Sequence, residues 1–170
     1  LGVALVLISK GHSGFLPYPE RKERLLCSLD RIRREAEARE QPVVLETLTP
    51  LESDTCTHPE ELTDVLDSIA SPLLFGMCDV VVPFVMGEDP VNYARILGNR
   101  FVHLHLADSN GYDETHLIFG EGCMKVEQIM RDFLAAGYNS RATLELVTHY
   151  IEDPSRASQR ILMKAKEFQL

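Results

Sequence analysis

Short apolar runs alternate with amphipathic segments along the whole chain. Five of these runs are rich in β-branched residues or leucine and are bounded by polar, glycine or proline residues, which is typical of buried β-strands. We therefore expect strands at 3–8, 43–48, 73–78, 101–106 and 142–147.

The segments between these runs have the spacing of helices. In each of four segments the apolar residues recur at steps of three and four, which places them on one helix face. The four sets are Leu25, Leu29, Ile32 and Ala36; Leu62, Val65, Leu66 and Ile69; Val126, Ile129, Met130 and Phe133; and Ala157, Ile161 and Ala165. Thr57 and Glu60 predict a capping box, with Pro59 in the first helical turn. Gly137 is expected to end the helix before it, and Asp153 to open the last one.

Strict alternation of strand and helix predicts an α/β fold with a parallel sheet and right-handed crossovers. Five such units fit either an open doubly wound sheet or part of a barrel. Polar residues end four successive strands, namely Glu46, Asp79, His105 and Glu145. Catalytic groups occupy this position in a TIM (β/α)8 barrel, and no GxGxxG motif follows the first strand. The pattern therefore favours an incomplete TIM barrel of about five βα units.

Composition and charge exclude several classes of protein. A formal charge of −9 and a pI near 5.1 argue against a nucleic-acid partner. The basic segment 21–39 also carries glutamates, so we expect a solvated helix face. The apolar run at 1–8 is too short to cross a membrane and has no basic lead-in. The four cysteines are far apart, which is typical of reduced thiols in a cytoplasmic protein.

The four strand-end residues predict a metal centre. Carboxylates that end buried strands need a compensating positive charge, and no Arg or Lys matches them at the strand ends. Three carboxylates and one imidazole, from Glu46, Asp79, His105 and Glu145, suit one divalent cation such as Mn²⁺, Mg²⁺ or Co²⁺. A salt-bridged core acid would explain one such residue, but not four in the same position.

Other polar residues allow two interpretations each. His103 shares the strand face of His105 but lies one layer deeper, so we expect a hydrogen-bonded core histidine rather than a ligand. His12 and His116 lie in loops at the predicted catalytic end and either contact substrate or order their loops. Asp108 either orients a ligand or caps a turn. The turn at 120–122 has an acidic centre, which favours a structural turn over a phosphate site.

Several segments together resemble a known family. They are LETLTPLES, HLHLADSNGYDETH, FGEGCM, DFLAAGYNS and LELVTHY. They are similar to the sugar-phosphate isomerase and epimerase group of the xylose-isomerase-like TIM barrels, most of all to fructoselysine 3-epimerases. The ketose 3-epimerases that act on tagatose and psicose are less similar.

The resemblance implies a metal-dependent sugar isomerase or epimerase. Glu46, Asp79, His105 and Glu145 would hold one divalent ion (Mn, Co, Mg, Ni or Zn). Glu46 and Glu145 would also exchange a proton with C3 of a ketose through a metal-stabilised cis-enediolate, and Glu52 would help to bind the sugar. We expect a homo-oligomer with a small sugar substrate, and neither a nucleic acid nor a membrane as partner.

Two positions depart from the ketose epimerase pattern. Val82 stands where those enzymes have a sugar-contacting histidine, and Gly111 stands where they have an arginine. The VVP run and the DSxG continuation are similar to those of fructoselysine-type epimerases. The resemblance therefore implies an aminated or otherwise modified ketose as substrate.

A TIM barrel needs roughly 250 residues, and the chain opens without Met on what resembles the fourth barrel strand. We expect residues 1–170 to be the C-terminal portion of one such domain, with an uncovered first strand and little activity of its own. Two alternatives stay open, namely a metal-dependent nuclease similar to endonuclease IV and a non-catalytic remnant. Metal content separates the remnant from the two enzymes, and an epimerisation assay separates the enzymes from each other.

Overall fold

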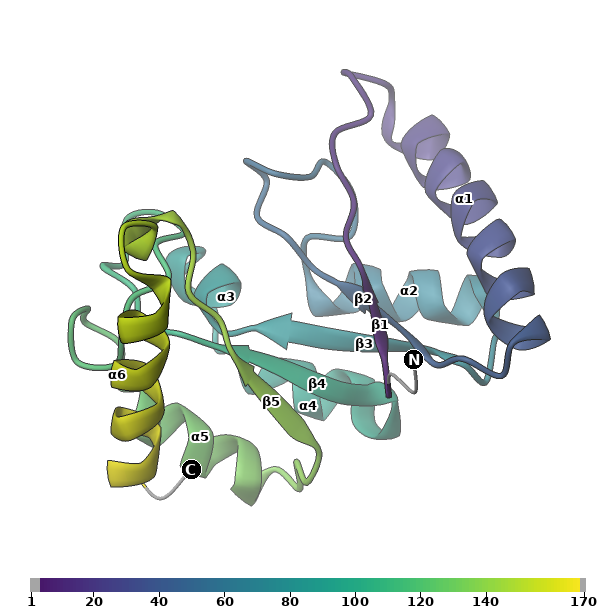
Figure 1. Cartoon of the computed structure of the whole chain (residues 1–170). Coiled ribbons are helices and arrows are strands. Elements are labelled where there is room, and N and C mark those ends of the chain that lie inside the picture. Colours follow the sequence, from purple (N-terminus) through teal and green to yellow (C-terminus); the bar gives the residue numbers. More distant parts are fainter. Residues whose placement is uncertain (1–3, 169–170) are drawn as a thin grey trace. The chain divides into compact units, whose positions relative to one another are not determined.

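The computed structural model describes residues 4–168 as a sheet of five strands with helices between them (Figure 1). The strands follow one another in sequence order, and the pairs β1–β2, β2–β3 and β4–β5 are parallel. This is the α/β arrangement that the alternating pattern predicts. The strands are β1 (Val6–Ile8), β2 (Val43–Glu46), β3 (Leu74–Asp79), β4 (Phe101–Leu106) and β5 (Arg141–Leu144).

The helices lie where the three- and four-residue spacing places them, with two additions between β3 and β4. They are α1 (Tyr18–Ala38), α2 (Pro59–Ile69), α3 (Val81–Val85), α4 (Asn92–Leu97), α5 (Val126–Ala135) and α6 (Pro154–Glu167), with 3-10 turns η1 (Gly98–Arg100) and η2 (Thr148–Tyr150). In residues 4–168, no helix is both long and apolar enough to cross a bilayer.

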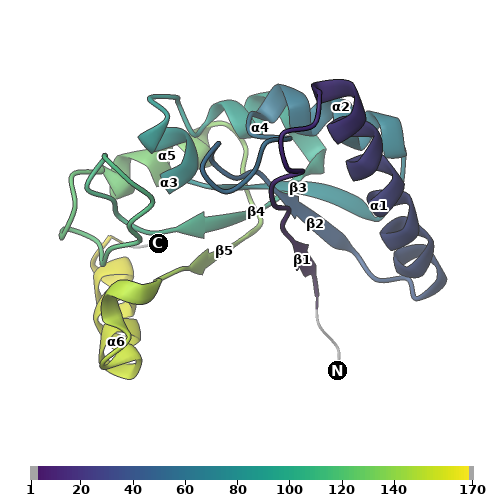
Figure 2. The same cartoon turned by 90° about the horizontal axis from the view of Figure 1, so that it is seen from above.

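The chain divides into two compact units, 1–77 with 96–102 and 78–95 with 103–170. In the first unit, α1 and α2 pack side by side (Figures 1 and 2). Strand β3 lies close to the helices at Gly76, where a Cβ would fall 2.8 Å from a Leu62 methyl carbon and 3.2 Å from one of Leu97. A glycine is therefore needed at this point of the strand.

The strands differ in how far they are covered. All four residues of β2 are buried, whereas Val6 and Leu7 of β1 are 39% and 43% exposed. Among the described strands, β1 pairs with β2 alone. The structure thus agrees with the expectation that the first strand has an uncovered edge.

The second unit is built on the two C-terminal apolar stripes. Of the predicted stripe on α5, Val126, Met130 and Phe133 are buried. The buried face of α6 consists of its three predicted apolar residues, Ala157, Ile161 and Ala165. Both of these helix faces were predicted correctly.

The predicted helix ends are correct in two of three cases. The Asp153 side chain accepts a hydrogen bond from the backbone N–H of Arg156, as expected of an N-cap, and Gly137 has a φ of 91° just after α5. The predicted capping box at α2 was wrong, because the N-cap is His58, which makes no side-chain capping hydrogen bond. The backbone N–H of Thr57 donates to Glu61 at 2.8 Å and not to Glu60, because α2 begins at Pro59.

Other boundaries differ from the predicted ones. Strand β1 begins at Val6, and the predicted residue 3 lies outside the described part. Strand β2 ends at Glu46, two residues early, since the chain then turns into a loop. Strand β5 runs from Arg141 to Leu144, and Glu145 follows it. The short helix α3 was not predicted, because VVPFV has the composition of a strand.

Candidate functional site

The carboxyl ends of β3, β4 and β5 carry three of the predicted ligands. Asp79 is the last residue of β3, His105 is the penultimate residue of β4, and Glu145 directly follows β5. Backbone hydrogen bonds keep these ends level: Val80 N–H donates to the His105 carbonyl at 3.1 Å, and Glu145 N–H donates to the Leu106 carbonyl at 3.0 Å. The three side chains therefore start from one edge of the sheet.

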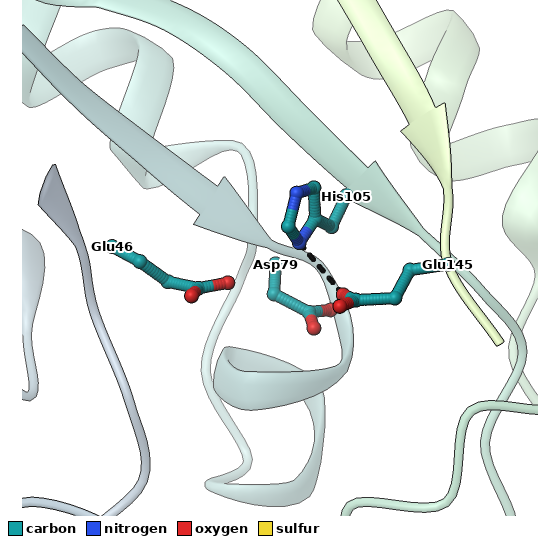
Figure 3. Close-up of side chains that lie close together, drawn as sticks. All are labelled: Glu46, Asp79, His105 and Glu145. Atoms are coloured by element: carbon teal, nitrogen blue, oxygen red, sulfur yellow. Dashed lines mark ion pairs between the residues drawn. The ribbon is translucent and has the colours of Figure 1, made fainter. Parts of the chain in front are cut away.

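These three side chains converge. His105 Nδ1 lies 2.7 Å from Glu145 Oε2, which is the contact dashed in Figure 3. A possible ligand atom from each of Asp79, His105 and Glu145 lies within 4.8 Å of those of the other two. Asp79 and His105 are only 3% and 6% exposed. Asp79 is also held in place, because its Oδ1 accepts the backbone N–H of Val81 at 2.8 Å.

Glu46, the fourth predicted ligand and the fourth side chain in Figure 3, belongs to the other unit. It ends β2, is 7% exposed, and pairs in register with Met77 of β3. Its backbone carbonyl accepts a hydrogen bond from Lys10 Nζ at 3.0 Å. Burial lowers the pKa of Lys10 from its usual value, although nearby acidic groups, Glu46 among them, oppose this.

His116 makes the contact that the sequence pattern did not reveal. It is 7% exposed, and its Nε2 lies 2.5 Å from Asp79 Oδ2 and 3.7 Å from Glu145 Oε2. Burial opposes the charged ring, but the hydrogen bond and charge of Asp79 outweigh burial and raise the pKa of His116 to about 9. The predicted loop histidine thus lies against two predicted ligands.

The ionisation of Glu145 is also set by its neighbours. Burial favours its neutral form, but the hydrogen bond and charge of His105, with the charge of His116, outweigh burial and lower the pKa of Glu145. His103 lies beside the site, with its ring edge-on to His105 at 5.4 Å between centroids. Its Nε2 lies 2.9 Å from Thr143 Oγ1, and burial with the nearby His105 lowers its pKa. His103 is thus hydrogen-bonded to a neighbouring strand.

Asp108 has its carboxylate directed into the loop that follows β4. Its Oδ2 accepts the backbone N–H groups of Gly120 and Gly122 at 2.8 and 3.0 Å, and its Oδ1 accepts those of Ser109 and Met124 at 2.8 and 2.9 Å. The side chain is 0% exposed. Of the two interpretations left open for Asp108, these contacts fit the ordering of a turn.

The turn at 120–122 is part of the same construction. Two of its backbone N–H groups are bonded to Asp108, so they are not available to a phosphate. Glu121, its acidic centre, accepts hydrogen bonds from Tyr150 and Arg160. The structural interpretation of this turn therefore holds.

His12 and Glu52, two predicted substrate contacts, lie in the first unit. His12 Nε2 lies 2.9 Å from the Leu51 carbonyl, and its Nδ1 is 4.0 Å from Asp54. The Glu52 side chain is exposed, and its backbone N–H donates to the Thr49 carbonyl. Their contact with substrate stays a prediction.

The donor set fits a divalent cation. Asp79, His105 and Glu145 combine two carboxylates with an imidazole at the ends of adjacent strands, mostly buried. Oxygen and imidazole donors of this kind suit Mn²⁺, Co²⁺, Ni²⁺ or Zn²⁺. A buried carboxylate such as Asp79 needs a compensating charge, which a bound cation would supply.

Comparison with known proteins points to one family. Residues 1–165 match the family model described as xylose isomerase-like TIM barrel. Among curated proteins, fructoselysine 3-epimerase from Shigella flexneri is 36% identical over 163 residues, which are 95% of this chain and 59% of that protein. The same enzyme from Escherichia coli O157:H7 matches at 36% identity over the same lengths.

Solved structures agree with this fold. A D-tagatose 3-epimerase-like protein superposes with a TM-score of 0.78 at 22% identity, covering 97% of this chain and 61% of that one. D-allulose 3-epimerase from Methylomonas sp. gives a TM-score of 0.78 at 14% identity, covering 96% and 63%. The chain thus spans about three fifths of the length of these relatives.

Proposed function

Because the chain belongs to the xylose isomerase-like TIM barrel family, we propose that it acts in a divalent-metal-dependent sugar 3-epimerase. Its relatives are sugar 3-epimerases, which supports this reaction class. The chain spans 59% of the length of its curated relative, so the activity of the whole protein is part of the proposal. The observation that carries it is the convergence of Asp79, His105 and Glu145 at the ends of adjacent strands.

Glu46 is proposed as the fourth ligand of the cation. Its register with Met77 puts it beside the part of β3 that leads to Asp79. Its place at the end of a buried strand, like that of Asp79 at the end of β3, supports this role. A divalent cation bound by these residues would polarise a sugar carbonyl and stabilise negative charge on its oxygen.

The two glutamates are proposed to move the proton. Glu145 has its pKa lowered and is therefore ionised at neutral pH, which is the form that removes a proton from C3 next to the carbonyl. Glu46, from another strand, would return a proton to C3 on the opposite face, which inverts that carbon. Which glutamate acts first depends on the configuration of the substrate.

The proposed substrate is a ketose that carries an amine or another modification. Val82 is 2% exposed within α3, so no polar side chain at this position reaches a sugar hydroxyl. Gly111 likewise offers no side chain to a sugar. A substrate that makes its polar contacts elsewhere fits these two positions, and fructoselysine, a ketosamine, is the substrate in the curated relative's name.

Product analysis tests this proposal. The whole protein that contains this chain is purified, stripped of metal and then loaded with Mn²⁺ or Co²⁺. It is incubated with fructoselysine, tagatose and psicose, and the products are identified by NMR. We expect the C3 epimer of the ketosamine to form fastest and only after metal is restored. The exposed Glu127→Gln variant should match the wild type. Equal conversion of all three sugars would contradict the substrate, and no C3 epimer from any sugar would contradict the function.

A further inference from the structure

His116 comes to the metal ligands from a loop rather than from a strand. Its Nε2 lies 2.5 Å from Asp79 Oδ2 and 3.7 Å from Glu145 Oε2, and the side chain is buried. The three residues belong to the same compact unit. An imidazole nitrogen from the loop thus lies against two of the candidate ligands, and it shares a hydrogen bond with Asp79.

The loop that carries His116 is rigidly built. Its next residue, Leu117, forms an isolated two-way backbone bridge with Asp108 at 2.8 Å in each direction. The Asp108 carboxylate accepts four backbone N–H groups from residues 109–124. A Cβ on Gly122 would fall 2.3 Å from the Ser109 carbonyl oxygen, so the loop closes tightly here. His116 is therefore positioned before any ligand arrives.

The hydrogen bond at its other nitrogen fixes the tautomer of His116. Nδ1 lies 2.8 Å from the backbone carbonyl of Glu114, and a carbonyl only accepts, so Nδ1 carries the hydrogen. In the neutral ring the lone pair is then on Nε2, which faces the carboxylates of Asp79 and Glu145. A backbone carbonyl bound to Nδ1 is the usual arrangement around a histidine that binds metal through Nε2.

A lone pair that faces two carboxylates is repelled unless a positive species lies between them. A proton on Nε2 fills this position in the hydrogen bond to Asp79, and a divalent cation in its place would bind the ring and both carboxylates at once. From this geometry we propose that His116 Nε2 is a further direct ligand of the divalent cation held by Asp79, His105 and Glu145. This inference rests on the metal site of the proposed function.

A second imidazole changes the preferred metal. Oxygen ligands alone suit Mg²⁺ and Ca²⁺, while imidazole nitrogens favour Co²⁺, Ni²⁺, Cu²⁺ and Zn²⁺. With His105 and His116 both bound, the site should discriminate strongly against Mg²⁺. Removal of His116 should weaken the binding of Co²⁺ far more than the binding of Mg²⁺.

Pulsed EPR of the Cu²⁺-loaded protein tests the coordination directly, because it resolves nitrogens bound to the ion. We expect two coordinated imidazole nitrogens in the wild type and one in His116→Asn, whose shorter amide does not reach the ion. The dissociation constant for Co²⁺ should rise by about tenfold or more. His149→Asn, which removes an exposed histidine of the same unit, should leave both values unchanged.

His116→Gln separates a ligand from a residue that only positions Asp79. Its longer amide can still donate a hydrogen bond to Asp79, so a positioning role would be rescued and the nitrogen signals would stay as in the wild type. A ligand role predicts that one nitrogen signal is lost in this variant too. Circular dichroism confirms that each variant is folded.

The inference is overturned if both His116 variants keep the two nitrogen signals of the wild type, whatever their Co²⁺ affinity. Its failure is distinguishable from failure of the proposed function, because the EPR experiment uses no sugar. A protein that loses one nitrogen signal on His116→Asn but epimerises no ketose would keep the inference and refute the function.

Discussion

Asp108→Asn is expected to destabilise the protein strongly, because one carboxylate organises the whole loop after β4. Asp108 is fully buried, and its two oxygens accept four backbone hydrogen bonds of 2.8–3.0 Å. Asparagine keeps one of these oxygens. Its NH₂ group would face two backbone N–H donors in place of the other oxygen.

The magnitude follows from these contacts. Two hydrogen bonds to a charged group are lost, each worth about 1.5–3 kcal/mol, and two backbone N–H groups are left without this acceptor. Since such effects are not additive, we expect the free energy of unfolding to fall by about 3–5 kcal/mol. Typical domains have only about 5–15 kcal/mol in total. The variant should therefore be close to the limit of folding at 37 °C.

Urea unfolding followed by far-UV circular dichroism measures this loss, since the chain has no tryptophan to report by fluorescence. Asp113→Asn is the matched control in the same loop, because Asp113 is exposed and its carboxylate accepts hydrogen bonds from Asn110 and Thr115. The control should cost less than about 1 kcal/mol. If Asp108→Asn costs no more than Asp113→Asn, the carboxylate does not organise the loop and the reasoning is refuted.

Three further predictions concern other parts of the chain. Gly122→Ala should lower the free energy of unfolding by about 2–3 kcal/mol in the same assay, because its Cβ would overlap the Asp108 side chain at 2.4 Å. The control Gly11→Ala, whose Cβ would have no atom within 4 Å, should change the free energy of unfolding little, and equal losses in the two variants would contradict this account. Asp54 has its pKa lowered, first by the Ser13 hydroxyl. Its contribution to stability is thus present above the unfolded pKa of about 3.9 and is lost as pH falls through the folded pKa. The stability difference between wild type and Asp54→Asn should shrink below about pH 4, and a constant difference would count against this pairing. Glu52→Gln should mainly raise KM in steady-state epimerisation assays; a comparable loss of kcat would show that Glu52 does more than bind the sugar.

Regular features of the fold were predictable because they are local. Strand β4 was predicted to the residue, and the buried faces of α5 and α6 follow from three- and four-residue spacing. Helix α3 was missed because its five residues are too few to show a helical period, and its valines favour strands. The α2 cap was misassigned since only the structure shows where the first turn begins.

The convergence of three candidate ligands was predictable as far as strand order determines it. Asp79, His105 and Glu145 end strands, so parallel order alone brings them to one edge. The contact of His116 with Asp79 spans 37 positions and depends on how a loop folds. That loop is shaped by hydrogen bonds from the Asp108 side chain to backbone N–H groups, which leave no periodic signal in the sequence. Side-chain contacts of this kind come only from the structure.

Solvent exchange at C3 tests the central claim most directly. The metal-loaded protein is incubated in D₂O with a ketosamine substrate, and mass spectrometry with NMR follows deuterium at C3. The proposed reaction predicts that deuterium enters at C3 and that a chelator stops this exchange. Glu145→Gln should abolish the exchange, because an amide cannot take up the proton, while the circular dichroism spectrum stays that of the wild type. Exchange at an undiminished rate in Glu145→Gln, or after removal of the metal, would contradict the account.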